Sequence, residues 1–91
     1  MLEEPALSNR DILCDMGYED AVVFDNPDYD NAIIGVSSDG RVIYDYDLMI
    51  EHLMRKDGMD EMEAADFIGY NTIRAAEYYQ DGPIVMYRLM E

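Results

Sequence analysis

The chain has few basic residues: six Lys and Arg stand against 21 Asp and Glu, which gives a formal net charge of −15 over 91 residues. Binding to DNA or RNA depends on Lys and Arg side chains that neutralise phosphates. Direct nucleic-acid binding is therefore disfavoured, as is binding to an anionic membrane surface. A negative field attracts basic partners, so the sequence predicts that the partner is a basic protein surface.

Other absences narrow the class of protein. The single cysteine, Cys14, excludes an internal disulfide and a cysteine-based zinc cluster. No run approaches the roughly 18 apolar residues that a membrane-spanning helix needs, and residues 1–4 lack the basic region of a signal peptide. We therefore expect a soluble protein in a reducing, cytoplasmic setting.

Catalytic and cofactor-binding motifs are missing as well. The sequence contains no Gly-rich phosphate loop, no nucleophile elbow and no pair of histidines at metal-ligand spacing. Its only histidine, His52, is predicted to lie on the solvent side of a helix, opposite Met49 and Leu53. A general base needs a substrate pocket and an orienting partner. We expect no enzymatic activity, no catalytic residues and no cofactor.

The apolar residues are sufficient and patterned enough for a fold. Leu, Ile, Val and Phe account for 21 of 91 residues, just above the level of roughly 20% below which disorder is expected. The patterns predict a single small α+β domain at 8–91 that follows a flexible N-terminal arm at 1–7. We expect an antiparallel three- to four-stranded sheet packed with two or three helices, in the order α-β-β-β-α-α-β.

Three helices are predicted from their start and stop signals. The first covers about 9–16, after a capping box of Ser8 and Asp11 and a hydrophobic staple of Leu7 and Ile12. The second starts near Asp45 or Asp47 and ends around Lys56, before Gly58. The third starts after a capping box of Asp60 and Glu63 and reaches about residue 70 or 71. For residues 72–80, a continued helix and a loop both remain open.

Four short runs are typical of strands: 21–24, 32–36, 41–46 and 84–87. Asp39 and Gly40 stand between the second and third runs, which is a strong hairpin signal. In the third run, Val42, Tyr44 and Tyr46 alternate with Arg41 and Asp45. This alternation predicts an antiparallel sheet with one buried face and one wet face.

The acid-rich turn at 25–31 does not fit an EF-hand calcium loop. Counted from Asp28, the position that requires Gly is Ile33, and the position that requires Glu is Asp39. Asp, Asn and Pro are also ordinary turn residues. We predict a plain turn and no metal site, with weak divalent-cation binding as an open alternative.

The candidate partner-binding surface consists of two groups of acids, one on this turn and one around the start of the third helix. Its predicted residues are Asp25, Asp28, Tyr29, Asp30, Asp57, Asp60, Glu61, Glu63 and Asp66. Carboxylates held densely on a rigid scaffold can imitate B-DNA, which carries one negative charge per about 1.7 Å of its axis. Exposed tyrosines are good interface anchors, and we expect Tyr29, Tyr70, Tyr78 and Tyr79 to be exposed. Any single acid at a helix N-terminus also has an ordinary structural role in capping.

Several segments also carry a family resemblance: residues 20–30 (DAVVFDNPDYD), 32–36 (AIIGV), 39–44 (DGRVIY) and 57–72 (DGMDEMEAADFIGYNT). In these segments the chain resembles small acidic proteins of phages and mobile elements of Gram-positive bacteria. The resemblance implies a mobile-element setting, where small acidic inhibitors of host defence, including anti-CRISPR proteins, are common. It implies no site residues.

Two functions are consistent with these observations. The first is a non-enzymatic inhibitor that mimics nucleic acid and blocks the basic groove of a host nucleic-acid-binding defence protein. The alternative is a small accessory protein–protein interaction module whose acidity serves solubility. The alternative allows a homodimer formed through tyrosine and methionine surfaces.

Overall fold

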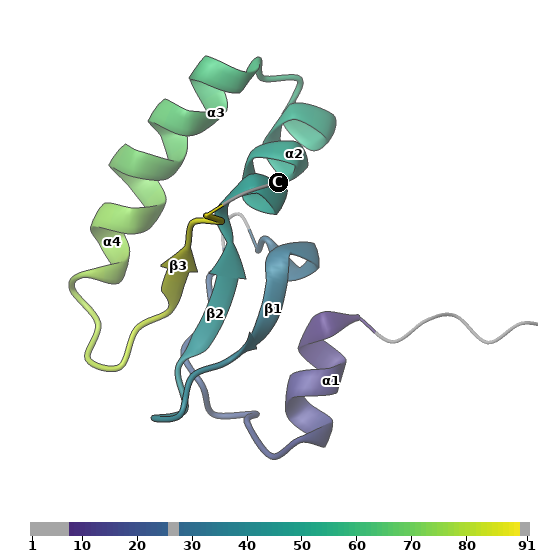
Figure 1. The fold of residues 1–91 in the computed structure, drawn as a ribbon, viewed down its shortest axis with the longest axis vertical. Helices are drawn as coiled ribbons and strands as arrows, with labels where there is room; N and C mark the ends of the chain where they lie inside the picture. Colours follow the sequence, from purple (N-terminus) through teal and green to yellow (C-terminus); the bar gives the residue numbers. More distant parts are fainter. Residues whose placement is uncertain (1–7, 26–27, 90–91) are drawn as a thin grey trace, which may run out of the picture.

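A three-stranded mixed sheet organises the chain in the computed structural model, which describes residues 8–25 and 28–89 (Figure 1). The predicted arm at 1–7, and Asn26 and Pro27 of the acidic turn, lie outside the described residues. The α+β class is confirmed. The elements follow in the order α1 (Asn9–Asp15), η1 (Asp30–Ala32), β1 (Ile33–Val36), β2 (Val42–Asp45), α2 (Tyr46–Asp57), α3 (Glu61–Phe67), η2 (Ile68–Ile73), α4 (Arg74–Ala76) and β3 (Ile84–Met86).

The sheet has the strand order β1-β2-β3, and only its first pair is antiparallel. β1 and β2 form the predicted hairpin. β3 pairs with β2 in parallel, with Tyr44 opposite Val85, so the prediction of a purely antiparallel sheet was wrong. The chain passes through α2, α3 and α4 between these strands, and such a helical crossover lets the next strand run in the same direction.

The predicted strand at 21–24 does not form, so the described sheet lacks the first of the four expected strands. These residues are extended chain beside the sheet rather than part of it. The Phe24 amide donates its hydrogen bond to the Tyr44 hydroxyl over 3.0 Å. A side chain of β2 thus takes the place of a neighbouring strand for this backbone group.

The predicted capping boxes are present in α1 and α3. The Ser8 hydroxyl accepts from the Asp11 amide over 3.1 Å, and the Asp60 carboxylate accepts from the Glu63 amide over 2.8 Å. The predicted stop of α2 is confirmed, because Gly58 adopts a left-handed φ of 71° directly after the helix. The staple partner Leu7 lies outside the described residues.

Residues 72–80, for which the sequence allowed a helix or a loop, are helical as far as Ala76 and form turns after it. α3 continues through a π-helical stretch, η2, into α4, so that the three form one rod beyond β3 in Figure 1. Gly69 and Asn71, two poor helix formers, lie in the wide turn of η2. The side-chain amide (Nδ2) of Asn71 donates to the Phe67 carbonyl over 3.3 Å.

The core lies between the inner face of the sheet and the helices. Val42 and Tyr44 point into it, as their alternation predicts, together with Met49, Leu53 and Ile68. Asp45 was expected on the wet face but is only 4% exposed. Tyr46 is the first residue of α2 and not the last of the strand. Among the described residues, no helix combines the length and the apolar character needed to cross a membrane.

Candidate partner-binding surface

The acidic turn is held by an arginine from α1, which sequence reasoning did not foresee. A terminal nitrogen of Arg10 lies 3.3 Å from Asp25, 3.2 Å from Asp30 and 3.2 Å from the Phe24 carbonyl. Burial raises the pKa of Asp30, and the Arg10 cation opposes this rise. Asp28 accepts a hydrogen bond from the Asp30 amide. The three carboxylates of the turn therefore all form contacts that stabilise the turn itself.

Tyr29 was predicted to be an exposed anchor, and this was wrong. It is 0% exposed, and its backbone has a left-handed φ of 47°. The hydroxyl pairs with the Thr72 hydroxyl over 2.9 Å. Burial raises the pKa of the Tyr29 phenol and the Asp57 carboxylate adds to the rise, while the bond to Thr72 lowers it.

The acids around the start of α3 divide into two kinds. All five are exposed, but Asp60 and Glu63 form the capping box, whereas Asp57, Glu61 and Asp66 lie outside it. The charge of the Asp57 carboxylate acts on the Tyr29 phenol, but no hydrogen bond or ion pair joins the two predicted acidic groups among the described residues. The structure does not show the nine predicted residues as one continuous row.

A surface that the sequence did not single out lies where β2 passes into α2. The rings of Tyr46 and Tyr87 stack with their centroids 4.7 Å apart and their planes tilted by 42°. Burial raises the pKa of Tyr46, and the Tyr87 phenol and the carboxylates of Asp47, Asp66 and Glu61 raise it further. Acids of α2 and α3 thus act electrostatically on Tyr46, whose partner Tyr87 is 58% exposed.

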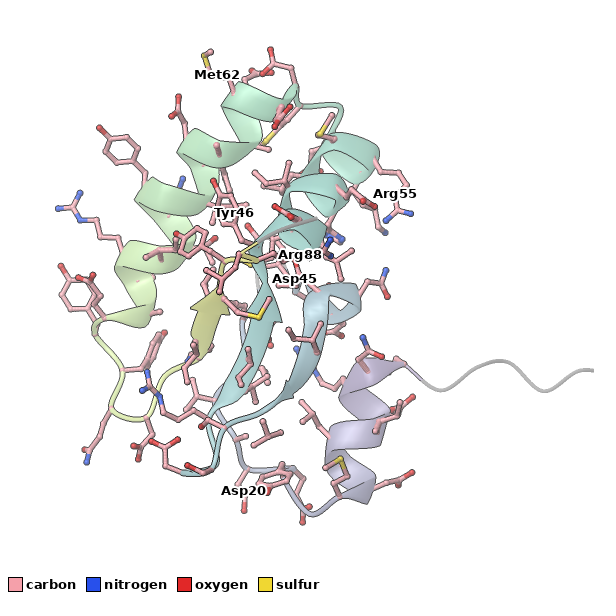
Figure 2. All side chains as sticks on the ribbon, viewed as in Figure 1. Asp20, Asp45, Tyr46, Arg55, Met62 and Arg88 are labelled. Atoms are coloured by element: carbon pink, nitrogen blue, oxygen red, sulfur yellow. The ribbon has the colours of Figure 1, made fainter. Side chains whose placement is uncertain are left out.

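Arg88 joins this surface to the sheet. Its Nε donates to the Asp45 carboxylate over 2.7 Å and lies 3.7 Å from Asp47. The hydrogen bond to Asp45 raises the pKa of Arg88, and the charges of Asp45, Asp47 and Glu51 add to this. Figure 2 shows Asp45, Tyr46 and Arg88 close together near the middle of the view, with Met62 at the top and Asp20 at the bottom.

We call this region the tyrosine–acid surface, and it consists of Tyr46, Asp47, Glu51, Glu61, Asp66 and Tyr87. It includes two of the predicted site residues, Glu61 and Asp66. A pattern search could not find the rest, because Tyr87 and Tyr46 are 41 positions apart in the sequence. The parallel pairing of β2 and β3 brings them together.

His52 was predicted to be solvated, and this was wrong as well. It is 8% exposed, and its ring contacts the Tyr29 ring at a centroid distance of 5.5 Å. The η1 turn covers the side of α2 that was expected to face water. Within the described residues, His52 Nδ1 has no hydrogen-bond partner.

The described residues contain no group of three or more His, Cys, Asp or Glu side chains that could hold a metal ion. Cys14 is an exposed free thiol. Comparison with protein-family models, with curated proteins and with solved structures finds no match to this chain. Its function must therefore be argued from its own residues.

Proposed function

We propose that this is a non-enzymatic binding protein whose tyrosine–acid surface occupies the basic, nucleic-acid-binding groove of a partner protein and so inhibits it. The Tyr46–Tyr87 ring pair, together with the charges of Asp47, Asp66 and Glu61 that act on Tyr46, supports this proposal. The setting implied by the sequence resemblance makes a host-defence protein the partner class.

The chemistry of the surface suits a groove that binds phosphates. Lys and Arg side chains that normally contact phosphates would contact the carboxylates of α2 and α3 instead. A tyrosine face can also receive a guanidinium or ammonium group. Tyr87 is 58% exposed and contacts Tyr46, on which these acids act, so a cation bound to the Tyr87 ring would also be attracted by their negative charge.

Mimicry is tested by competition. The protein is used to capture its partner from a host lysate at moderate salt, and the purified partner is then titrated with DNA. We expect DNA and this protein to exclude each other from the partner. The affinity of the partner for each of them should fall steeply as the salt concentration rises. A partner that binds DNA and this protein at the same time would refute mimicry.

Two double variants with equal charge assign the binding to this surface. Glu61→Gln with Asp66→Asn removes two carboxylates beside the tyrosine pair and leaves the Asp60–Glu63 capping box intact. Asp15→Asn with Asp20→Asn removes two exposed carboxylates near α1. We expect the first to weaken partner binding about tenfold more than the second, a difference of about 1.4 kcal/mol. Equal effects would mean that only the net charge matters.

A second function, the accessory interaction module, is favoured by a different observation. Several large apolar side chains are well exposed, namely Ile34, Met62, Tyr70 and Tyr78, and the acids of the turn serve the fold through Arg10. This function predicts a partner whose affinity hardly depends on salt. It also predicts that neither charge variant weakens binding.

A further inference from the structure

A cavity of about 260 Å³ separates the extended chain before the acidic turn from the helical rod. Three aromatic rings and one carboxylate are among its eight lining residues. The lining side chains that concern its chemistry are Phe24, Asp25, Tyr29, Asn71, Thr72 and Tyr79. The cavity is distinct from the tyrosine–acid surface, with which it shares no residue.

The inner wall of the cavity is fixed by contacts on several sides. Phe24 meets Tyr29 edge to face, with ring centroids 5.9 Å apart, and its amide is held by Tyr44. The Tyr29 hydroxyl is bonded to Thr72 of η2. Residues 23–24, part of the segment that was predicted to form a strand, thus line one side of this space, and the π-helix η2 lines the other.

The outer wall is open and negatively charged. Tyr79, which follows α4, is 59% exposed, and the side chain of Asp25 is 80% exposed. Asp25 shares Arg10 with Asp30 and the Phe24 carbonyl. Since Arg10 keeps these two other acceptors, the Asp25 carboxylate can receive a second cation without releasing α1.

Aromatic faces with an adjacent carboxylate form an environment that favours an organic cation. The volume lies below the roughly 300–1,000 Å³ of sites for drug-sized ligands, so a single side chain suits it better than a larger molecule. Guanidinium groups stack on aromatic rings and also bond carboxylates. A protein of charge −15 in addition attracts cations toward the opening.

We propose that this cavity is a specificity pocket for an arginine side chain, with Tyr79 and Phe24 against the guanidinium plane and Asp25 as its counter-ion. The identity of the donor as the basic partner protein rests on the proposed function. The pocket itself does not, because its ligand chemistry can be tested with a free arginine derivative.

The test is a titration of the full chain with N-acetyl-arginine amide, followed by amide chemical shifts in two-dimensional NMR. We expect saturable shifts confined to residues 23–25, 29, 71–75 and 79. The corresponding citrulline derivative has nearly the same shape without the charge, and we expect it to bind at least about tenfold more weakly. Shifts spread over carboxylates across the whole surface, or equal binding of citrulline, would overturn the pocket.

Matched variants assign the two contacts. Asp25→Asn and Asp15→Asn each remove one exposed negative charge, and Tyr79→Ala and Tyr78→Ala each remove one exposed ring. We expect Asp25→Asn and Tyr79→Ala to raise the dissociation constant of N-acetyl-arginine amide roughly two- to fivefold. The control variants Asp15→Asn and Tyr78→Ala should leave it unchanged. Equal effects of paired variants would also overturn the pocket.

The two proposals fail in different ways. If N-acetyl-arginine amide does not bind, while this protein and DNA still compete for the partner, the pocket is wrong and the proposed function stands. If N-acetyl-arginine amide binds at the pocket, while the partner binds DNA and this protein at the same time, the pocket stands and nucleic-acid mimicry is wrong. In that case the arginine donor is an ordinary basic segment of another protein.

Discussion

Tyr44 should govern the stability of this fold in alkaline solution. Its side chain is fully buried in the core. Burial raises the pKa of its phenol to about 12, and the nearby charges of Asp30 and Asp25 raise it while the Phe24 amide and Arg10 lower it. The same hydroxyl holds the chain that forms the inner wall of the arginine pocket.

The size of the effect follows from the shift. In the unfolded chain the phenol has an ordinary pKa of 10.0, so between about pH 10 and 12 the unfolded state releases a proton that the folded state keeps. The free energy of unfolding therefore falls as the pH rises through this window. Each pKa unit is equivalent to about 1.36 kcal/mol, so Tyr44 alone accounts for a loss of about 2 kcal/mol by pH 12, and this loss is small below pH 10.

Urea denaturation of the wild type and of Tyr44→Phe, at neutral pH and at steps up to about pH 12, measures this loss. We expect Tyr44→Phe to be about 1 kcal/mol less stable at neutral pH, because the Phe24 amide loses its acceptor. The variant should then lose about 2 kcal/mol less than the wild type between neutral pH and about pH 12.

Tyr78→Phe is the control, because Tyr78 is 82% exposed, and we expect it to follow the wild type. The other seven tyrosines and Lys56 titrate in the same range, so the contribution of Tyr44 is measured as the difference between the wild type and Tyr44→Phe. If Tyr44→Phe and the wild type lose the same free energy, the hydroxyl is not protected by burial and the reasoning about the core fails.

Two further predictions concern side chains whose environment the sequence did not reveal. Asp45→Ala should lower the free energy of unfolding by about 1 kcal/mol, because Asp45 accepts from the Leu48 amide at the start of α2. Asp45→Asn should keep this acceptor, so equal thermal shifts for both variants would show that the pair with Arg88 matters more than the cap. His52→Leu should leave the stability within about 1 kcal/mol of the wild type or above it, because it removes a buried nitrogen without a partner among the described residues. A larger loss in urea denaturation would mean that the contact with the Tyr29 ring outweighs that nitrogen.

Signals that act within a few residues were read correctly from the sequence. The capping boxes of Ser8 with Asp11 and of Asp60 with Glu63 join neighbours three positions apart. Gly58 needs only its own backbone freedom to stop α2. Such features hardly depend on the rest of the fold, so the three helices and the hairpin were predictable.

The errors concern contacts between distant parts of the chain. Residues 21–24 have the composition of a strand, but Tyr44 takes their hydrogen bond and leaves them outside the sheet. Tyr29 and His52 looked exposed because nothing in their local pattern indicates that they pack against each other. The direction of β3 depends on a crossover of three helical segments, which no local signal encodes.

The candidate site shows the same division. Glu61 and Asp66 were predicted as surface acids and are exposed. Their neighbours on the tyrosine–acid surface could not be predicted, since Tyr87 reaches Tyr46 only through the pairing of β3 with β2. The pairing of Arg10 with Asp25 and Asp30 is likewise a contact across 15 and 20 positions.

The position of β3 links the tyrosine–acid surface to local unfolding. β3 has three residues at the edge of the sheet, and its partner Ile43 lies 41 positions before Ile84. A short edge strand with distant partners is among the first parts of a domain to open. Tyr87 and Arg88 follow it directly, so each opening separates Tyr87 from Tyr46 and Arg88 from Asp45. The fraction of molecules able to bind would then equal the fraction with β3 in place, and a partner that binds this surface would protect the amides of β3 from hydrogen exchange.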